Sequence, residues 1–295
     1  MEQQFVFLVG AGRSGTTLLQ KVLALHPEIG STTNYHRHLP DWLSGVLLRS
    51  IRRFPKLKKS MWFKEGGNAY FIDRPWIIRI FPAPVEDEGI YRACGMPIAS
   101  NDVCQLSAEV LTCLRRRFER MGRFMGAKVF IDKRIANIRR LPWLRAAFPN
   151  ARFLHLVRDG REVAHSLATV SWWPERVVWW AGAKPAELEM RGMHALEICA
   201  RNWVEDIRAV QRGLTGIEKD NVQEIRYESL LDRPVDEIRK VLSFLQLEMP
   251  RELESVIRSL RLQPRAPFWR HNWNCDEVKR VEAEQYALLK ELHYL

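Results

Sequence analysis

The sequence predicts an α/β fold in which a mostly parallel central sheet carries helices on both faces, the three-layer arrangement of P-loop NTPase-like proteins. Two observations lead to this prediction. Short apolar runs alternate with longer segments of helical periodicity, a pattern typical of strands joined by crossover helices. The first apolar run is followed at once by a glycine-rich turn and a helix. We therefore expect about five strands in a single domain over residues 1–295.

The first element is a strand at residues 5–9, where all five side chains are apolar. Such a run is typical of a strand that is buried on both faces. The turn GAGRSGTT follows at residues 10–17, and leucines at helical spacing continue to residue 25. A glycine turn between strand and helix directs backbone N–H groups at an anion, and Thr16 and Thr17 add hydroxyl donors.

This turn differs from a Walker A motif at one position. Gly10 and Gly15 have the required spacing, but Thr16 stands where nucleoside triphosphatases have lysine. The only cation inside the turn is Arg13. The sequence therefore predicts a phosphate-bearing ligand with a different group to transfer. A glycine-rich turn without a ligand, and an ATP-dependent kinase with Asp132 as its Mg²⁺ ligand, are the alternatives.

The later elements follow from the same periodicity and from proline, glycine and polar boundaries. A strand entry is expected near residue 29, a helix from about 40 to 53, and a long helix from about 101 to 122. The second half alternates strands at 127–131, 151–157 and 222–227 with helices at 139–148, from 160, at 189–212 and at 234–245.

The net charge of +11 favours an anionic ligand or surface. Nucleic acid is one such partner, but a polyanionic nucleotide and an acidic acceptor fit the charge equally well. No module that interleaves basic and aromatic residues for nucleic acid is recognisable, so we expect no nucleic-acid partner.

Five scattered cysteines form no CxxC pair, so a metal site is not expected. Reduced thiols in a cytosolic protein are the simplest interpretation. No apolar run reaches the roughly 18 residues of a membrane span, and the first strand leaves no room for a signal peptide. The sequence therefore predicts a cytoplasmic protein without a transmembrane segment.

A second candidate anion site follows the strand at 151–157. Arg158 stands at the carboxyl end of this strand, and Ser166 lies about two helical turns further on. Ligands of open parallel sheets bind at this edge, and an arginine fork with a hydroxyl suits a phosphate group. A salt bridge from Arg158 to a nearby acid is the alternative.

These motifs together resemble the superfamily of sulfotransferases that use 3′-phosphoadenosine 5′-phosphosulfate (PAPS), in the style of its bacterial members. GAGRSGTT matches the family's 5′-phosphosulfate loop, and FPNARFLHLVRDGREVAHSL at 148–167 matches its 3′-phosphate motif. IRYESLLDRP at 225–234, SFLQL at 243–247 and the closing LKELHY match further segments. Residues of about 40–125 and 168–222 lie outside the motifs, and we interpret them as variable insertions on the acceptor side.

The resemblance implies transfer of a sulfonyl group from PAPS to a hydroxyl or amine of a small-molecule, glycan or lipid acceptor, with no metal. Adenosine 3′,5′-bisphosphate would be the released product. The implied donor-binding residues are Gly12, Arg13, Ser14, Gly15, Thr16, Thr17, Arg158, Ser166 and Tyr227. Arg13 would also stabilise the charge that grows on the leaving phosphate. A non-catalytic nucleotide-binding relative is a further alternative.

The sequence departs from the family at the base. Many members have a glutamate about eight residues beyond an HP pair, but this chain has Asn34, which cannot accept the proton. The histidine of cytosolic relatives is replaced by Ile135. His36 is therefore the predicted base, because an imidazole suits proton abstraction at neutral pH. Lys133 at a strand end is a second electrophile candidate, and a structural His36 is the alternative.

A tryptophan-rich stretch at residues 172–180 borders the acceptor in family terms. Its two tryptophan pairs are about seven residues apart, so one helix face could carry both. An aromatic wall for the acceptor and ordinary core packing are equally open interpretations. The family's usual proline after the RD pair is replaced by Gly160.

Overall fold

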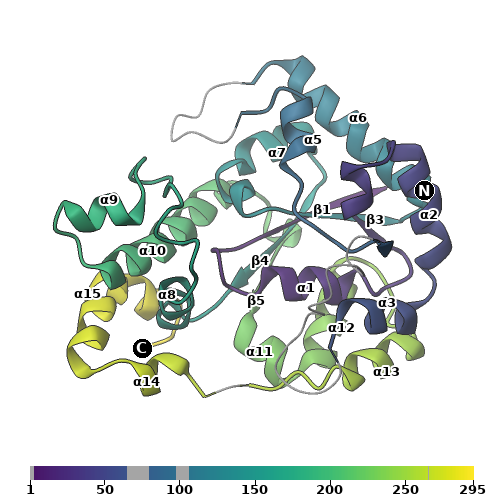
Figure 1. The fold of residues 1–295 in the computed structure, drawn as a ribbon. Coiled ribbons are helices and arrows are strands. Elements are labelled where there is room, and N and C mark those ends of the chain that lie inside the picture. Colours follow the sequence, from purple (N-terminus) through teal and green to yellow (C-terminus); the bar gives the residue numbers. More distant parts are fainter. Residues whose placement is uncertain (1–2, 65–79, 98–105, 265) are drawn as a thin grey trace.

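The computed structural model describes residues 3–64, 80–97, 106–264 and 266–295. Its centre is a parallel sheet of five strands in the order β2-β3-β1-β4-β5 (Figure 1). The strands are β1 Gln4–Val9, β2 Ile29–Ser31, β3 Val129–Lys133, β4 Arg152–Val157 and β5 Val222–Arg226. The predicted fold class is confirmed.

Helices connect the strands and surround the sheet (Figure 1). The α-helices up to the fourth strand are α1 Thr16–Leu23, α2 Asp41–Ile51, α3 Pro55–Trp62, α5 Glu88–Ala93, α6 Ala108–Met125 and α7 Leu141–Ala147. Those that follow are α8 Gly160–Ala168, α9 Pro185–Met190, α10 Ala195–Leu214, α11 Tyr227–Asp232, α12 Pro234–Phe244, α13 Arg251–Ser259, α14 Phe268–Asn272 and α15 Cys275–Glu291. Three 3₁₀ turns complete the described part: η1 Asn34–Arg37, η2 Ile135–Arg139 and η3 Lys219–Asn221.

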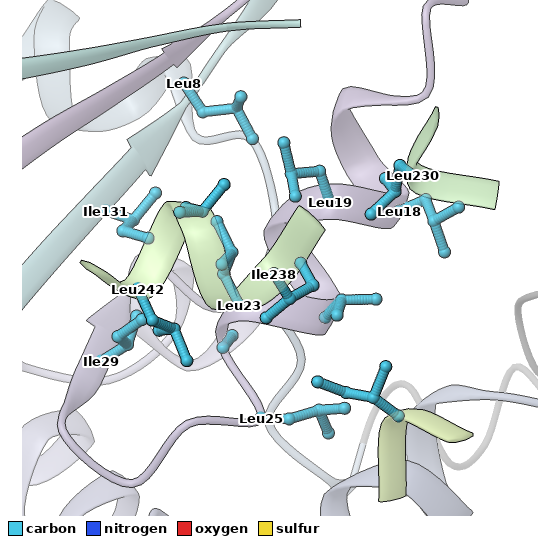
Figure 2. Close-up of a cluster of buried hydrophobic side chains, with 14 of the residues drawn as sticks. Leu8, Leu18, Leu19, Leu23, Leu25, Ile29, Ile131, Leu230, Ile238 and Leu242 are labelled. Atoms are coloured by element: carbon cyan, nitrogen blue, oxygen red, sulfur yellow. The ribbon is translucent and has the colours of Figure 1, made fainter. Parts of the chain in front are cut away.

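One face of the sheet is packed with aliphatic side chains from α1 and α12. Leu8 of β1 and Ile131 of β3 point to this face, where they belong to one cluster with Leu23 of α1 and Ile238 of α12 (Figure 2). Burial of one such side chain contributes about 2 kcal/mol to folding. The periodic leucines of α1 therefore fix this helix on the sheet and hold its first turn at the end of β1.

The other face is aromatic. Phe7 points to the face opposite Leu8, because successive side chains of a strand alternate. Its ring centroid lies 6.4 Å from that of Phe118 on α6, 5.3 Å from Phe148 and 5.8 Å from Phe153 of β4. This cluster holds α6 and α7 on the face that α1 does not cover.

The strand register places the functional loops side by side. In this parallel sheet Leu8 pairs with Lys133 of β3, and Val9 pairs with His155 of β4. The carboxyl ends of β1, β3 and β4 therefore meet at one edge, where ligands of such sheets bind. The sequence-predicted anion sites follow β1 and β4, so the sheet brings both to this edge.

Element boundaries differ from the sequence prediction by a few residues. The long helix predicted from 101 begins at Ala108, and positions 101–105 lie outside the described residues. The third strand extends to Lys133, two residues beyond the predicted end at 131, and this lysine stands at the strand end as expected. Tyr227 opens α11 instead of ending β5.

The tryptophan-rich stretch forms turns, so the expectation of a shared helix face was wrong. Residues 171–183, called the Trp loop below, close through an antiparallel bridge between Val178 and Ala183. Indole N–H groups of Trp179 and Trp180 donate to Asp206 and Asn202 at 2.8 and 3.2 Å. These side-chain hydrogen bonds hold the Trp loop against α10, and the backbone of the loop forms turns rather than a helix.

The cysteines differ from the expectation of reduced thiols. Cys94 at the end of α5 and Cys113 on α6 form a disulfide, so the expectation was wrong for this pair. Cys199 is buried and free, Cys275 is exposed and free, and Cys104 lies outside the described residues. Within the described residues no helix combines the length and the apolar composition that crossing a bilayer requires.

We expect the double variant Cys94→Ala/Cys113→Ala to lose about 3 kcal/mol of unfolding free energy. The disulfide closes a loop with a sequence separation of 19 residues, and its removal restores the chain entropy of that loop. Urea denaturation followed by circular dichroism measures the loss. The control is Cys275→Ala, which removes an exposed free thiol; equal stability of the two variants would contradict the prediction.

Candidate functional site

A pocket of about 660 Å³ lies at the carboxyl edge of the sheet. Its walls come from segments far apart in the sequence, since the parallel strands bring their following loops together. It is lined by the loop after β1 with the first turn of α1, Glu86, the end of β3 with η2, Arg158 before α8, the last turn of α8, the Trp loop, α10 and Tyr227.

The loop after β1 requires glycine at two positions. A Cβ on Gly10 would lie 2.5 Å from the carbonyl oxygen of Leu156. Gly15 has φ +92°, and a Cβ there would lie 2.3 Å from the ring of Tyr227. Helix α1 then begins at Thr16 without a side-chain cap. A helix N-terminus of this kind offers its first N–H groups to an anion.

The two predicted anion sites touch each other. The Nε of Arg13 donates to the hydroxyl of Ser166 at 3.0 Å, and the Nη1 of Arg158 donates to the carbonyl oxygen of Arg13 at 3.0 Å. The guanidinium carbon of Arg158 lies 4.5 Å from the ring centroid of Tyr227. Both sites therefore lie on the same side of the sheet, within the span of one small ligand.

The salt bridge considered as an alternative for Arg158 is present as well. Its Nη2 lies 2.9 Å from Glu162, one turn along α8. This ion pair holds one side of the guanidinium, and the other nitrogen, Nη1, is directed at the loop after β1. Arg158 therefore has both the structural contact and a place in the pocket wall.

The pocket is strongly basic. Among the described residues, its six cationic lining residues are Arg13, Lys133, Arg134, Arg139, Arg158 and Arg176, against the two carboxylates of Glu86 and Asp206. Burial and the neighbouring Arg158 lower the pKa of the Arg13 guanidinium. An anion between the two arginines relieves their repulsion, so the unliganded pocket favours a polyanion.

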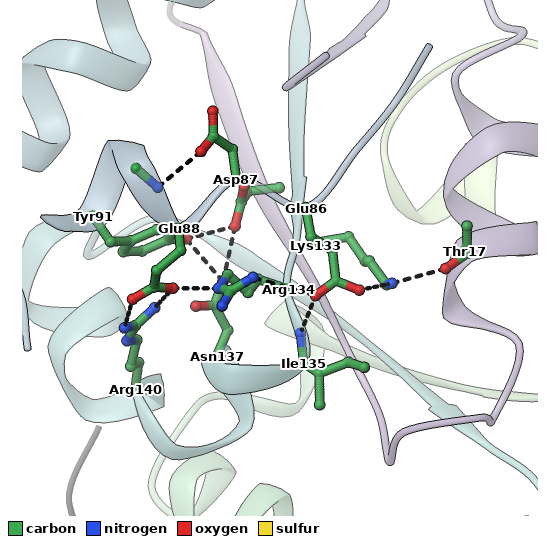
Figure 3. Close-up of polar contacts among 12 residues, drawn as sticks. Thr17, Glu86, Asp87, Glu88, Tyr91, Lys133, Arg134, Ile135, Asn137 and Arg140 are labelled. Carbon is green, nitrogen blue, oxygen red and sulfur yellow. Dashed lines mark hydrogen bonds and ion pairs between the residues drawn. The ribbon is translucent and has the colours of Figure 1, made fainter. Parts of the chain in front are cut away.

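Lys133 lies between the loop after β1 and a carboxylate (Figure 3). Its Nζ donates to the hydroxyl of Thr17 at 2.9 Å and forms an ion pair with Glu86. The lysine side chain is 3% exposed, whereas that of Glu86 is 28% exposed. The ammonium is therefore enclosed at the first turn of α1, and the carboxylate faces the open pocket.

His36 does not reach the pocket. Its side chain is buried in η1, and its Nδ1 accepts from the backbone N–H of Thr33 at 3.1 Å. Its Nε2 is enclosed and has no hydrogen-bond partner among the residues that the structure describes. Burial lowers the pKa of the ring to about 4, although Asp41 and Asp87 act in the opposite direction. The alternative of a structural histidine describes this position better than the predicted base.

Asn34 joins two segments of the chain. Its Oδ1 accepts from the N–H of Ala83 at 2.8 Å, and its own N–H donates to the carbonyl of Ala83 at 3.2 Å. The next pair, Thr33 and Pro84, forms an antiparallel bridge. The asparagine therefore fixes the segment that leads to Glu86.

The model of the sulfotransferase family matches residues 5–251 of the chain. The chain belongs to the sulfotransferase family. It is 24% identical over 246 residues to the protein-tyrosine sulfotransferase of Drosophila melanogaster, with 83% of this chain and 38% of that protein covered. Protein-tyrosine sulfotransferase 2 of Gallus gallus is 24% identical over 244 residues, with 83% and 51% covered. The chain thus spans about half or less of the length of these relatives.

Two solved sulfotransferase structures are similar in fold. The sulfotransferase domain from the curacin biosynthetic pathway aligns with a TM-score of 0.55 and 13% identity, covering 100% of this chain and 99% of that one. Sulfotransferase STF9 from Mycobacterium avium aligns with a TM-score of 0.57 and 15% identity, covering 98% and 76%. At these identities the likeness concerns the fold alone.

In this member of the sulfotransferase family, Asp206 of α10 is a pocket residue that sequence reasoning missed. It accepts from the N–H of Gly12 at 3.2 Å and from the indole of Trp179 at 2.8 Å. Burial raises its pKa to about 6. The sequence feature that could have identified Asp206 is an acidic residue on the buried face of an amphipathic helix. Glu86 was missed because its segment has no periodicity.

The tryptophans lie both in the pocket wall and in the core. Trp172, Trp173 and Trp179 line the pocket, and Trp173 also belongs to the core beside α8 and α10. Trp203 is fully buried in that core. It explains the departure at Gly160, where a Cβ would lie 2.6 Å from the Trp203 ring. A proline at position 160 is therefore excluded because its Cβ would clash with the Trp203 ring, and not because of a contact to the ligand.

Ser14 is the one predicted loop residue outside the pocket wall as described. Its side chain is fully buried, and its hydroxyl has no hydrogen-bond partner within the part of the chain that the structure describes. Gly12, Arg13, Gly15, Thr16 and Thr17 line the pocket, as do Lys133, Arg158, Ser166 and Tyr227. The structure thus brings together nearly all predicted donor-binding residues, with Ser14 beneath the loop.

We expect Asp206→Asn to become more stable relative to the wild type as the pH rises from 4 to 7. The pKa of about 6 in the folded state lies above that of an ordinary aspartate, so the wild type loses stability as the pH rises through this range, whereas the asparagine does not titrate. The difference in unfolding free energy should change by about 2 kcal/mol between these pH values. Denaturant titrations at pH 4 and 7 measure it.

The matched control is Asp236→Asn on α12, whose side chain is 60% exposed. The other buried acids contribute the same pH dependence to the unfolding free energy of variant and wild type. Their contribution therefore drops out of the difference between the two proteins. A pH-independent difference between wild type and Asp206→Asn would contradict the prediction.

Proposed function

We propose that this protein transfers the sulfonyl group of PAPS to an acceptor hydroxyl. The observation that carries the proposal is the direct contact of the two phosphate-binding segments, from Arg13 to Ser166 and from Arg158 to the backbone of Arg13. One nucleotide with phosphates at both ends of its ribose spans such a site. Family membership and the absence of the kinase lysine at Thr16 support the same donor.

The pocket fits this donor in shape and charge. The glycines after β1 leave room that a Cβ would fill, and Gly12, Arg13, Gly15, Thr16 and Thr17 would hold the 5′ end. Arg158 and Ser166 would hold the 3′-phosphate, with Tyr227 near the adenosine. PAPS supplies the sulfonyl group and leaves as adenosine 3′,5′-bisphosphate.

The chain contributes electrostatic stabilisation to the reaction. Lys133 is held by the Thr17 hydroxyl at the end of β3, and Arg13 by the Ser166 hydroxyl. Fixed cations at these places stabilise charge that moves onto the departing phosphate, without reorganisation during the step. Removal of a contact of this type typically lowers kcat by about 10²–10³.

For the acceptor we propose a phenolic hydroxyl, with a tyrosine side chain of a peptide as the first candidate. The relatives in Drosophila melanogaster and Gallus gallus are named protein-tyrosine sulfotransferases. Trp172 and Trp179 in the pocket wall suit a flat ring, and Arg139 and Arg176 beside them suit anionic groups that flank it. Small-molecule, glycan and lipid hydroxyls are the comparison classes.

One prediction from the proposed function concerns nucleotide binding. The wild type should be stabilised more by adenosine 3′,5′-bisphosphate than by adenosine 5′-monophosphate, because only the former reaches Arg158. Arg158→Ala and Ser166→Ala should each lose this preference, with a fall in bisphosphate affinity of about 10-fold or more for the arginine. Thermal shift and calorimetric titration measure both effects.

Arg239→Ala, which removes an arginine that is 49% exposed on α12, is the matched control. A preference that persists in Arg158→Ala contradicts the proposed 3′-phosphate site. Stabilisation of the wild type by ATP with Mg²⁺ alone would favour the kinase alternative.

The second prediction concerns catalysis. Lys133→Ala should lower transfer of label from ³⁵S-PAPS by about 10²-fold or more, since its ammonium stabilises the moving charge. The assay offers tyrosine peptides with and without acidic neighbours, phenols, sugars and a lipid alcohol. Transfer to none of these classes by the wild type, with intact nucleotide binding, would refute the proposed activity.

A further inference from the structure

Two carboxylates line the pocket among the described residues, Glu86 and Asp206. Proton abstraction from an acceptor hydroxyl needs a group that faces the place where the acceptor lies. The family's glutamate position holds Asn34, and His36 is enclosed in η1 away from the pocket. The surroundings of Glu86 and of Asp206 show which of these two carboxylates is open to an acceptor hydroxyl.

Asp206 is closed to an acceptor by burial. One of its oxygens accepts from the indole of Trp179, and the other accepts from the N–H of Gly12 and the amide of Asn202 at 3.3 Å. Its side chain is almost fully buried. These bonds make Asp206 a support for the loop after β1 and for the Trp loop.

Glu86 keeps an open side. Its Oε1 contacts Lys133, and its Oε2 accepts from the N–H of Ile135 at 3.1 Å and lies 3.6 Å from Arg134 (Figure 3). A carboxylate has about four acceptor positions, so these contacts leave capacity for another donor. The side chain is 28% exposed, and the exposed part belongs to the pocket wall.

The segment that carries Glu86 is anchored at several points. Asn34 holds Ala83, the N–H of Val85 donates to the carbonyl of Thr32 at 3.1 Å, and the indole of Trp62 donates to the carbonyl of Pro82 at 2.9 Å. A fixed backbone gives the carboxylate a defined position. The residue at the family's base position thus helps to place a carboxylate that comes from elsewhere in the chain.

We propose that Glu86 is the general base of this enzyme. This proposal rests on the proposed function. In the step, the acceptor hydroxyl gives its proton to the Glu86 carboxylate while the acceptor oxygen forms a bond to sulfur. The bond between sulfur and the bridging oxygen of the 5′-phosphate breaks, and its electron pair leaves on that phosphate. No further reactant is needed.

The charges around Glu86 keep it ionised. Lys133 and Arg134 face the carboxylate from the end of β3, Asp132 lies behind them, and Arg37 of η1 donates to the Glu86 backbone carbonyl. Burial raises the pKa of Glu86, but Lys133, Ile135 and Arg134 outweigh burial and hold it below its usual range. So acidic a group takes the proton late, when the acceptor oxygen has become acidic through its bond to sulfur.

The test is Glu86→Gln, assayed with a series of substituted phenols whose pKa values run from about 10 to about 7, the upper end being that of tyrosine. With the least acidic phenol, kcat should fall by about 10²–10⁴, the usual contribution of a general base. The deficit should shrink as the phenol becomes more acidic, and should nearly vanish for a phenol that is ionised at the assay pH. A purely structural role predicts the same deficit for every phenol.

A second readout is independent of turnover. Affinity for adenosine 3′,5′-bisphosphate should stay the same or rise in Glu86→Gln, because the substitution removes a negative charge beside Lys133. A structural role predicts weaker binding and a lower melting temperature. Glu284→Gln on α15, outside the pocket wall, is the matched control for the change of side chain.

The outcomes separate the proposals. If Glu86→Gln retains kcat within about threefold for the least acidic phenol, or if its deficit does not depend on the phenol, Glu86 is not the base. A deficit of that size and dependence in His36→Gln instead assigns the base to His36. If Glu86→Gln fails to fold, the same series is run with Glu86→Asp, which moves the carboxylate back by one methylene and should show the same dependence. Wild-type protein that binds the nucleotide yet sulfates no acceptor overturns the proposed function together with this role.

Discussion

The contact of the loop after β1 with Arg158 and with Ser166 of α8 organises the whole site. Arg13 and Ser166 meet there, and Arg158 reaches back to the same loop. Such a contact is possible because β1 and β4 are parallel neighbours, so their carboxyl ends lie at one edge. The aliphatic and aromatic layers on the two faces of the sheet hold the strands in register. The positions of the pocket residues at the sheet edge therefore depend on this packing.

The sequence was sufficient for the parts of the molecule that rest on local patterns. Apolar strands, the glycine turn and the periodic leucines of α1 predict five strands and the first loop, because each pattern reports the burial of a single element. Arg158 and Ser166 could be placed at the sheet edge for the same reason. The family resemblance and the family model agree over most of the chain.

The rest depends on contacts that no local pattern reveals. Glu86 reaches the pocket through pairing of its segment with residues 32–34, and the tryptophans adopt turns because their indoles bond to α10. The disulfide between Cys94 and Cys113 was missed because scattered cysteines contain no information about which helices pack together. His36 shows that a reactive residue type near a motif can be buried and bonded to its own turn, and its assignment as the base stays a prediction.

The excess of cations in the pocket has a practical consequence. In the described part of the chain six basic side chains and two carboxylates line one cavity, and a field of this kind attracts small inorganic anions as well as nucleotides at low ionic strength. Phosphate or sulfate buffers therefore compete for the same space and understate ligand affinity. Purification and titration in chloride at moderate ionic strength, with a neutral buffer, expose the intrinsic selectivity of the protein.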